Sequence, residues 1–113
     1  MTLLMVALGA AVGAPLRFAT DRLIGSPWGT LTVNVIGSLI LGFVLAAPLS
    51  PTLVALLGTG FCGALTTYST FSWETLAMAR RGERAAALGY VAASVALGLG
   101  AAWLGSFLGD LYE

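Results

Sequence analysis

The chain has 113 residues, of which 58% are apolar and 9% are charged, and its formal net charge is zero. Soluble domains carry about 25% charged residues, and a chain this short has too little interior to hide so much apolar surface from water. We therefore expect residues 1–113 to form a single membrane domain. The balanced charge and the absence of histidine argue against a nucleic-acid partner and remove the usual general base, so an enzyme is the least expected class.

Four apolar blocks follow one another along the chain. We predict an all-α membrane protein with four transmembrane helices over residues 2–20, 28–47, 51–79 and 85–109. The first, second and fourth blocks suit a bilayer core, which a helix of about 20 residues crosses. Small residues that permit close helix packing in lipid recur in these blocks at Gly9, Gly13, Gly37, Gly42, Gly98 and Gly100.

The third block is too long for one straight helix across a bilayer core. Its middle contains three glycines followed by a run of hydroxyl side chains: Gly58, Gly60, Gly63, Thr66, Thr67, Ser69, Thr70 and Ser72. Glycines weaken a helix, and hydroxyls satisfy backbone groups that a break sets free. We predict two helical halves joined by a non-helical segment near residues 63–67. Transporters hold ions at such breaks.

Polar residues within the other blocks are expected to face the same interior. Asn34 must find partners at membrane depth, in another helix or in a pore, and a bond to another helix is the commoner role. Tyr90 and Ser94 stand four residues apart and therefore share a helix face. Arg17 stands four residues before Asp21, so we predict an ion pair at the end of the first helix.

The third block offers mainly neutral donors, with Glu74 toward its end as its only acid. Hydroxyls, an amide and ring edges can replace the water around a small anion without trapping it as an arginine would. Conduction requires such weak binding at several sites. Carbonyls at a broken helix suit a cation instead. The residues therefore predict a membrane passage for a small anion, together with a candidate cation site.

Three motifs lie within these blocks. Residues 13–18 read GAPLRF, residues 29–37 read GTLTVNVIG, and residues 60–74 read GFCGALTTYSTFSWE. Their combination, over the whole chain, resembles the Fluc/CrcB family of fluoride channels. The resemblance implies a passive, fluoride-selective channel in the plasma membrane (the cell inner membrane), which lets accumulated fluoride leave the cell and lowers its toxicity. It also implies an antiparallel, dual-topology dimer with two pores.

The resemblance also implies roles for individual residues. A structural sodium ion at the dimer centre is implied, held by the backbone carbonyls of Gly63 and Thr66. The implied fluoride pore is lined by Asn34, Tyr68, Ser69, Thr70, Phe71, Glu74, Tyr90 and Ser94. Within this set, Tyr68 and Phe71 match two stacked phenylalanines, and Ser69 and Thr70 match a hydroxyl track that ends at Glu74.

Tyr68 departs from the family pattern, which has a phenylalanine at this position. A tyrosine keeps the ring edge, but its hydroxyl needs a partner when it is buried. We therefore expect the fluoride path beside Tyr68 to be altered, or one of the two pores to be weaker.

The distribution of the arginines is also unequal between the two sides of the membrane, whereas a homodimer whose chains insert in both orientations should show little such bias. The arginines lie in or beside the first and third connections, at Arg17, Arg22, Arg80, Arg81 and Arg84. The positive-inside rule places these connections in the cytoplasm and both termini outside. We therefore hypothesise a fixed orientation, with an oppositely oriented homologue as the partner in place of a second copy.

Two alternatives to a conducting homodimer remain open. One is a non-conducting or partly conducting membrane subunit of a heterodimeric channel. The other is a transporter like the small multidrug exporters, which also have about four short helices. Such an exporter needs an acid in its first helix to exchange protons, and residues 2–20 contain none, so this alternative is less favoured.

Overall fold

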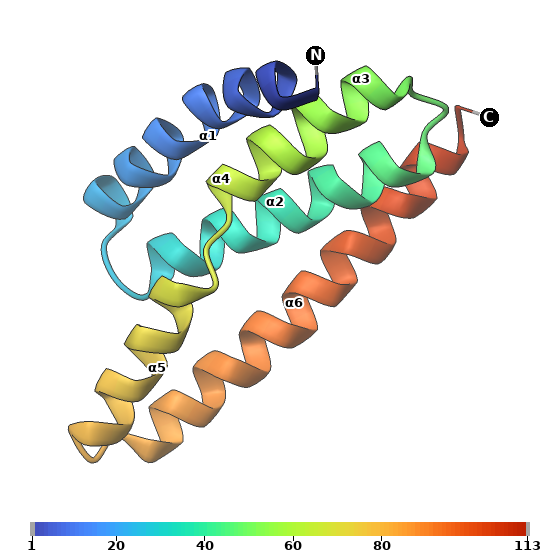
Figure 1. Ribbon diagram of the computed structural model, residues 1–113. Coiled ribbons are helices and arrows are strands. Elements are labelled where there is room, and N and C mark those ends of the chain that lie inside the picture. Colours follow the sequence, from blue (N-terminus) through green and yellow to red (C-terminus); the bar gives the residue numbers. More distant parts are fainter. Residues whose placement is uncertain (1, 113) are drawn as a thin grey trace.

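The computed structural model describes residues 2–112, and every regular element within that range is a helix (Figure 1). Four helical stretches are long and apolar enough to cross a membrane: Thr2–Ile24, Trp28–Ala46, Pro51–Arg80 and Arg84–Asp110. Their mean hydropathies are 1.6, 1.9, 1.2 and 1.8, and the lowest belongs to the stretch with the hydroxyl run. The predicted all-α protein with four helices of membrane-spanning length is confirmed.

The first, second and fourth spans are the continuous helices α1 (Thr2–Ile24), α2 (Trp28–Ala46) and α6 (Arg84–Asp110). α1 extends past its predicted end at residue 20, because Asp21 and Arg22 remain helical. It ends before Gly25, whose φ of 86° lies in the left-handed region that favours glycine.

The third span is interrupted, as predicted, but the interruption begins later than residue 63, where the glycine pattern led us to expect it. It consists of α3 (Pro51–Val54), the π-helix η1 (Ala55–Cys62), α4 (Gly63–Leu65) and α5 (Ser69–Arg80). The non-helical residues are 66–68. The expected start of the break at residue 63 was therefore wrong, because Gly63 is helical and begins α4. The preceding glycines, Gly58 and Gly60, lie inside the π-helix.

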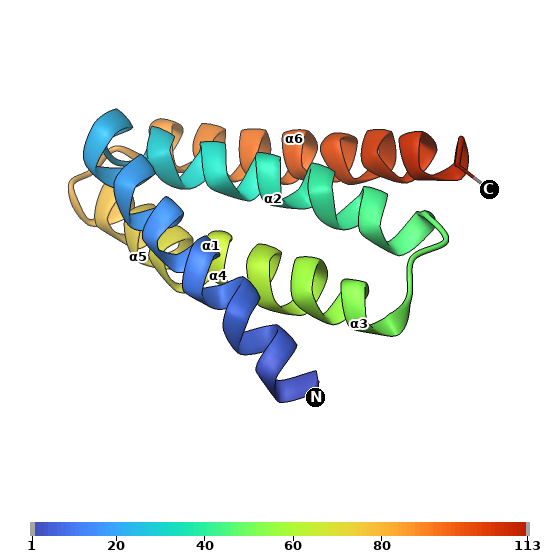
Figure 2. The same ribbon diagram turned by 90° about the horizontal axis from the view of Figure 1, so that it is seen from above.

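The two ends of the molecule carry different connections. The start of α1, the α2–α3 connection and the end of α6 lie at one end (Figures 1 and 2). The α1–α2 and α5–α6 connections lie at the opposite end. The bundle measures 47 × 27 × 20 Å, so its long dimension exceeds the about 30 Å of a hydrocarbon core. The connections at both ends can therefore reach the headgroup regions.

Glycines bring α1 and η1 into backbone contact. A Cβ atom built at Gly60 would lie 2.5 Å from the carbonyl oxygen of Val6, and one at Gly9 would lie 2.6 Å from the nitrogen of Phe61. Real Cβ atoms essentially never approach other atoms so closely. This close approach supplies the van der Waals contact that holds helices together in lipid, where burial from water no longer contributes.

α2 and α6 approach each other in the same way near their C-terminal ends. A Cβ atom at Gly105 would lie 2.9 Å from the nitrogen of Phe43, and one at Gly42 would lie 3.0 Å from the carbonyl carbon of Ala102. The packing role predicted for Gly42 is confirmed. Gly100 makes no such contact among residues 2–112, because no atom of the described chain lies within 4 Å of a Cβ built there, so its predicted packing role stays a prediction.

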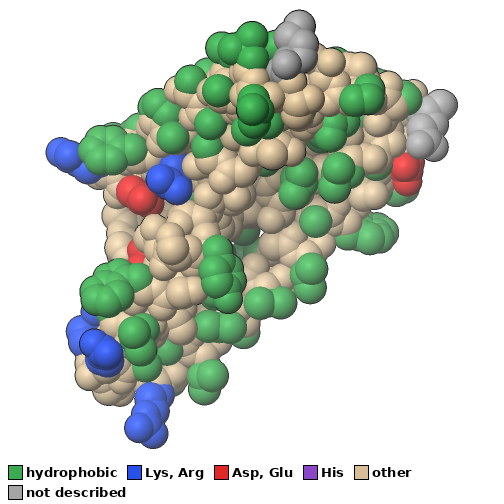
Figure 3. All heavy atoms as spheres, viewed as in Figure 1, with side chains coloured by type: hydrophobic (Ala, Val, Ile, Leu, Met, Phe, Trp, Pro, Cys, Tyr) green, Lys and Arg blue, Asp and Glu red, His purple; other side chains and the backbone are tan. Residues whose placement is uncertain are grey.

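The interior is small, and most large apolar side chains lie on the outside. Val33, Val44 and Cys62 are each 2% exposed, whereas Leu3 and Leu23 are each 86% exposed. Figure 3 shows apolar side chains spread over the visible face of the bundle. Soluble monomers rarely expose large apolar side chains over so much of their surface, and such a surface suits contact with lipid chains or with another membrane subunit.

Candidate functional site

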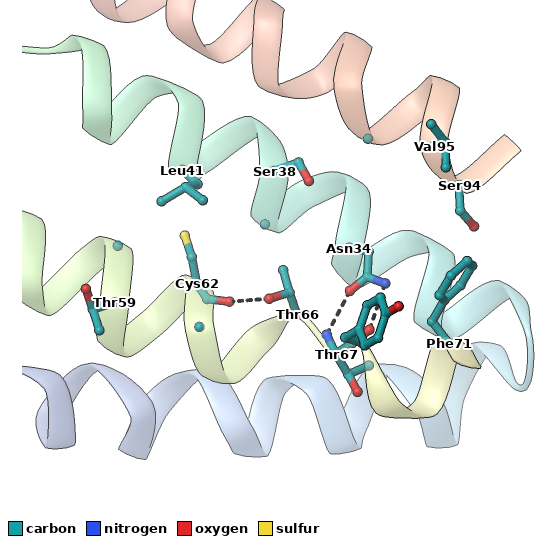
Figure 4. Close-up of a pocket in the computed structure, with 15 residues that line it drawn as sticks. Asn34, Ser38, Leu41, Thr59, Cys62, Thr66, Thr67, Phe71, Ser94 and Val95 are labelled. Atoms are coloured by element: carbon teal, nitrogen blue, oxygen red, sulfur yellow. Dashed lines mark hydrogen bonds between the residues drawn. The ribbon is translucent and has the colours of Figure 1, made fainter. Parts of the chain in front are cut away.

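A cleft of about 540 Å³ lies between α2, the interrupted third span and α6. It collects side chains from elements that are distant in the sequence (Figure 4). Six of the predicted site residues line it: Asn34, Gly63, Thr66, Tyr68, Phe71 and Ser94. The cleft therefore brings both predicted sodium ligands together with four of the predicted pore residues.

Asn34 joins α2 to the break in the third span. Its side-chain nitrogen donates to the Thr67 carbonyl at 3.0 Å, and its Oδ1 accepts from the Thr67 N–H at 2.8 Å. In an uninterrupted helix, the Thr67 N–H would instead bond to the carbonyl of Gly63. The amide thus holds the chain out of helical register at this point. The interhelical role expected for an isolated Asn is present, and the side chain also borders the cleft (Figure 4).

Two threonines shape the backbone on either side of the break. The Thr66 N–H and hydroxyl both donate to the Cys62 carbonyl, at 2.9 and 2.8 Å, and this closes the helix that precedes the break. The Thr67 hydroxyl accepts from the Thr70 N–H at 3.2 Å. This contact satisfies one of the free donors at the start of α5, in the manner of a helix cap. The paired threonines therefore end one helix and begin the next.

The backbone carbonyls at Gly63 and Thr66 have the character of hard cation ligands. The Gly63 carbonyl has lost its usual donor, because the Thr67 N–H bonds to Asn34. Thr66 has an extended conformation with ψ of 159°, which turns its carbonyl away from the helical direction. Both residues border the cleft. Carbonyl oxygens are suitable ligands for a sodium ion. Two carbonyls supply only part of its coordination shell, so other groups would have to supply the rest.

Three aromatic rings form a series from the break toward α6. The ring centroids of Tyr68 and Phe71 are 6.3 Å apart, and those of Phe71 and Tyr90 are 5.2 Å apart. Both pairs are tilted, at 48° and 47°, so they are not stacked face to face. Tyr68 is 81% exposed, whereas Tyr90 is 4% exposed. The series thus runs from an open surface to a buried ring.

Glu74 lies at the buried end of this series. It is 8% exposed, and its Oε1 accepts a hydrogen bond of 2.8 Å from the Tyr90 hydroxyl. Its Oε2 accepts from the hydroxyl of Ser26, in the α1–α2 connection. Glu74 and Tyr90 were both predicted site residues, and the structure places them in direct contact. Ser26 was not predicted, because no periodicity marks a residue in an irregular connection.

Two buried hydroxyls have no hydrogen-bond partner among the described residues. They belong to Ser94, which borders the cleft, and to Thr30, which is 0% exposed. Thr30 was also missed, although it lies in the GTLTVNVIG motif four residues before Asn34. A buried free hydroxyl offers a donor to a small ligand.

Ser69 and Thr70 do not line the cleft of this chain. Ser69 is exposed and Thr70 is half-buried. The predicted ion pair between Arg17 and Asp21 is absent, because within residues 2–112 the single ion pair joins Arg81 to Glu83, at 2.6 Å. The helical spacing allows the Arg17–Asp21 contact but does not compel exposed side chains to make it.

Comparison with known proteins identifies the family. A family model described as "CrcB-like protein, Camphor Resistance (CrcB)" matches residues 4–106. The fluoride-specific ion channel FluC 2 of Rhodococcus jostii is 53% identical over 109 residues, which cover 93% of this chain and 96% of that protein. FluC 1 of Streptomyces avermitilis is 51% identical over 115 residues, covering 93% of each chain.

A more distant relative agrees with these two. The fluoride-specific ion channel FluC of Leptospira interrogans is 41% identical over 118 residues, which cover 95% of this chain and 93% of that protein. These relatives are named as ion channels and not as enzymes. The similarity spans nearly the full length of each, and the chain therefore belongs to the CrcB family of fluoride-specific ion channels.

Proposed function

We propose that this chain forms a fluoride-selective channel that lets fluoride leave the cell passively across the plasma membrane. The observation that carries this proposal is the chemistry of the cleft. Its fifteen lining residues supply an amide, hydroxyls and aromatic rings, and none of them is charged. Neutral donors bind a small anion weakly enough to release it, which conduction requires.

The conducting unit in this proposal is an antiparallel dimer. One chain leaves the cleft open, with Tyr68 81% exposed at its border. A second, inverted chain would cover this face and enclose a path beside the rings. Asn34, Tyr68, Phe71 and Ser94 line that path, and Ser69, Thr70, Glu74 and Tyr90 continue it along α5 and α6. Ser69 and Thr70 do not line the cleft of the single chain, so they would border the path only if the partner chain packs against the side of α5 that carries them.

A structural sodium ion at the dimer centre belongs to the same proposal. The carbonyls of Gly63 and Thr66 would hold it, and a two-fold axis would double this set of ligands. When bound, the ion supplies a fixed positive charge that joins the two broken helices. The support is the Gly63 carbonyl, whose helical donor is diverted to Asn34.

Gly63→Ala tests the sodium site without disturbing the single chain. A Cβ atom there would meet only the Gly58 carbonyl oxygen, at an ordinary 3.9 Å. The substitution keeps the carbonyl, but Gly63 is exposed in the single chain, so in the proposed dimer the added methyl would stand between the two chains and keep their carbonyls apart. We therefore expect the variant to fold but to lose the dependence of dimer stability on sodium, compared with N-methylglucamine. Gly100→Ala is the matched control, since its Cβ has open space. Unchanged sodium dependence in Gly63→Ala would remove this residue from the site.

A non-conducting or partly conducting subunit of a heterodimer is the second candidate. Five arginines lie at one end of the molecule, around the α1–α2 and α5–α6 connections, where the basic side chains of Figure 3 gather. Such asymmetry favours one orientation in the membrane. An antiparallel dimer would then require a homologue with the opposite bias.

Fluoride efflux from liposomes tests the channel directly, with chloride as the control ion. We expect fluoride efflux from the chain alone or with a co-expressed homologue, and little chloride efflux. Efflux only with the homologue supports the heterodimer. Phe71→Ile should suppress efflux while the dimer still forms, because it removes a ring edge from the path. Asn34→Asp should also suppress efflux while the dimer still forms, because it adds a charge to the neutral lining and loses the bond to the Thr67 carbonyl. No fluoride efflux under either condition overturns the proposal.

A further inference from the structure

A second groove, of about 430 Å³, lies at the arginine-rich end of the molecule. It shares no lining residue with the cleft described above, but its wall includes Tyr90, which also belongs to the proposed fluoride path. Its walls come from the start of α2, from α5 with the following turn, and from the first half of α6. The lining residues are Pro27, Trp28, Met78, Arg81, Glu83, Ala86, Gly89, Tyr90 and Ala93.

The body of this groove is apolar and follows α6. Ala86, Gly89 and Ala93 lie three and four residues apart, so they form one face of the helix. Gly89 leaves the floor open, because no atom of the described chain lies within 4 Å of a Cβ built there. Trp28, 58% exposed, borders the same space. A furrow of small residues beside an exposed tryptophan has the shape and chemistry to hold a hydrocarbon chain.

The mouth of the groove is positively charged. Arg81 and Glu83 line it and pair with each other at 2.6 Å. Arg80 and Arg84 lie in the same turn and are exposed. The turn therefore carries three positive charges against one negative charge. It also lies where one membrane span ends and the next begins, at residues 80 and 84, which is the depth of lipid headgroups.

We propose that this groove binds an anionic phospholipid, with the phosphate group at the 80–84 turn and one acyl chain along α6. The apolar furrow alone would accept any lipid. The excess of arginine at its mouth selects an anionic headgroup over a zwitterionic one, since basic residues beside a membrane attract anionic lipids. The proposal does not depend on fluoride conduction, because lipid binding is measured on the assembled protein whether or not it conducts.

Native mass spectrometry of the purified protein tests the headgroup, with phosphatidylglycerol and phosphatidylcholine of the same chains as probes. We expect phosphatidylglycerol to bind more tightly. Arg84→Gln should weaken phosphatidylglycerol binding about fivefold, as the loss of one charge near an anionic lipid predicts. Glu83→Gln should strengthen it, because it removes the only acid and releases Arg81. Equal binding of the two lipids, or a shift in the same direction for both variants, overturns the proposal.

Gly89→Leu tests the acyl-chain furrow. The leucine side chain has room at this exposed position and would occupy the groove, so we expect it to reduce binding of both lipids. Gly100→Leu is the matched control, since it lies on the same helix, also faces open space and lies outside the groove. Equal loss in the two variants, or no loss in Gly89→Leu, would contradict the proposal. If Gly89→Leu fails to fold, the opposite effects expected for Arg84→Gln and Glu83→Gln still test the lipid site.

Discussion

At the scale of single residues, the bond between Asn34 and Thr67 decides the geometry of the site. Thr67 is 7% exposed, so its backbone N–H and carbonyl have little access to water. One side-chain amide satisfies both groups. These two hydrogen bonds fix the orientation of the Asn34 side chain. Asn34 therefore stabilises the break and lines the cleft at the same time.

Asn34→Ala should destabilise the fold, because it leaves the N–H and carbonyl of Thr67 unpaired. A buried polar group without a partner costs about 1–3 kcal/mol. We expect a loss of that size in the free energy of unfolding, measured by chemical denaturation in detergent. Thr32→Val is the control, since the Thr32 hydroxyl bonds only within its own helix, to the Trp28 carbonyl. An equal loss in both variants would contradict the bridging role.

Tyr68→Phe should change conduction without changing stability. Tyr68 is 81% exposed in the single chain, and the substitution keeps the ring that a partner chain would cover, so the change in the unfolding free energy should stay within about 0.5 kcal/mol. The variant keeps the ring edge and removes a hydroxyl that can retain an anion, so we expect faster fluoride efflux at unchanged unfolding free energy. Slower efflux would show instead that the hydroxyl is a useful donor in the path.

The contacts around Glu74 show which site residues a sequence can reveal. Glu74 and Tyr90 were predictable, since an acid and a tyrosine are conspicuous in apolar helices. Ser26 was not, because its contact with Glu74 spans 48 residues and joins an irregular connection to a helix. The free hydroxyl of Thr30 was equally hidden, because threonine in a helix commonly bonds to its own backbone.

At the scale of elements, the sequence predicted that the third span is broken but not the residue at which the break begins. Local composition pointed to Gly63, where the glycines end. The chain instead stays helical to Leu65 and opens at Thr66. Besides the local bonds of Thr66 and Thr67, two bonds from Asn34 on a different span hold Thr67 out of helical register, and no local rule contains such a contact. Glycine propensity was overridden by tertiary hydrogen bonding.

The glycines of the third span have a different use, which Gly60→Ala tests. The added Cβ would collide with the Val6 carbonyl of α1, so the two backbones must separate. Overpacking of this kind costs about 1–3 kcal/mol. Gly100→Ala should act in the opposite sense and stabilise by up to about 1 kcal/mol, since its Cβ has free space. Thermal unfolding in detergent compares them, and equal melting temperatures would contradict the packing assignment.

At the scale of the whole molecule, the cleft of the single chain is open on one side. The cleft is bordered on one side by the exposed ring of Tyr68, and large apolar side chains cover the outside of the bundle. Helix number and membrane setting follow from composition, because lipid accepts few architectures. In the proposed dimer, closure of the path would depend on the partner, and a partner's surface leaves no periodic pattern in the sequence of one chain.

We expect the unequal distribution of arginine between the two ends of the molecule to set the orientation of the chain in the membrane. Both arginine-bearing connections lie at one end in the structure, so the positive-inside rule predicts that this end stays in the cytoplasm. A C-terminal cysteine tag should then react with an impermeant maleimide from outside the cell. The native Cys62 should stay silent, because it is 2% exposed. Labelling from both sides in equal amounts would contradict a fixed orientation.

Removing the charge from one connection tests whether arginine is the cause. Arg80→Gln, Arg81→Gln and Arg84→Gln, combined in one variant, leave Arg17 and Arg22 as the only basic residues. Because orientation follows the difference in basic charge between the two sides, and this difference is reduced but not removed, part of the tag should now appear on the cytoplasmic side. If the heterodimer forms only from fixed orientations, this variant should also gain fluoride efflux without the homologue. A tag that remains wholly outside would show that packing against the partner, and not charge, fixes the orientation.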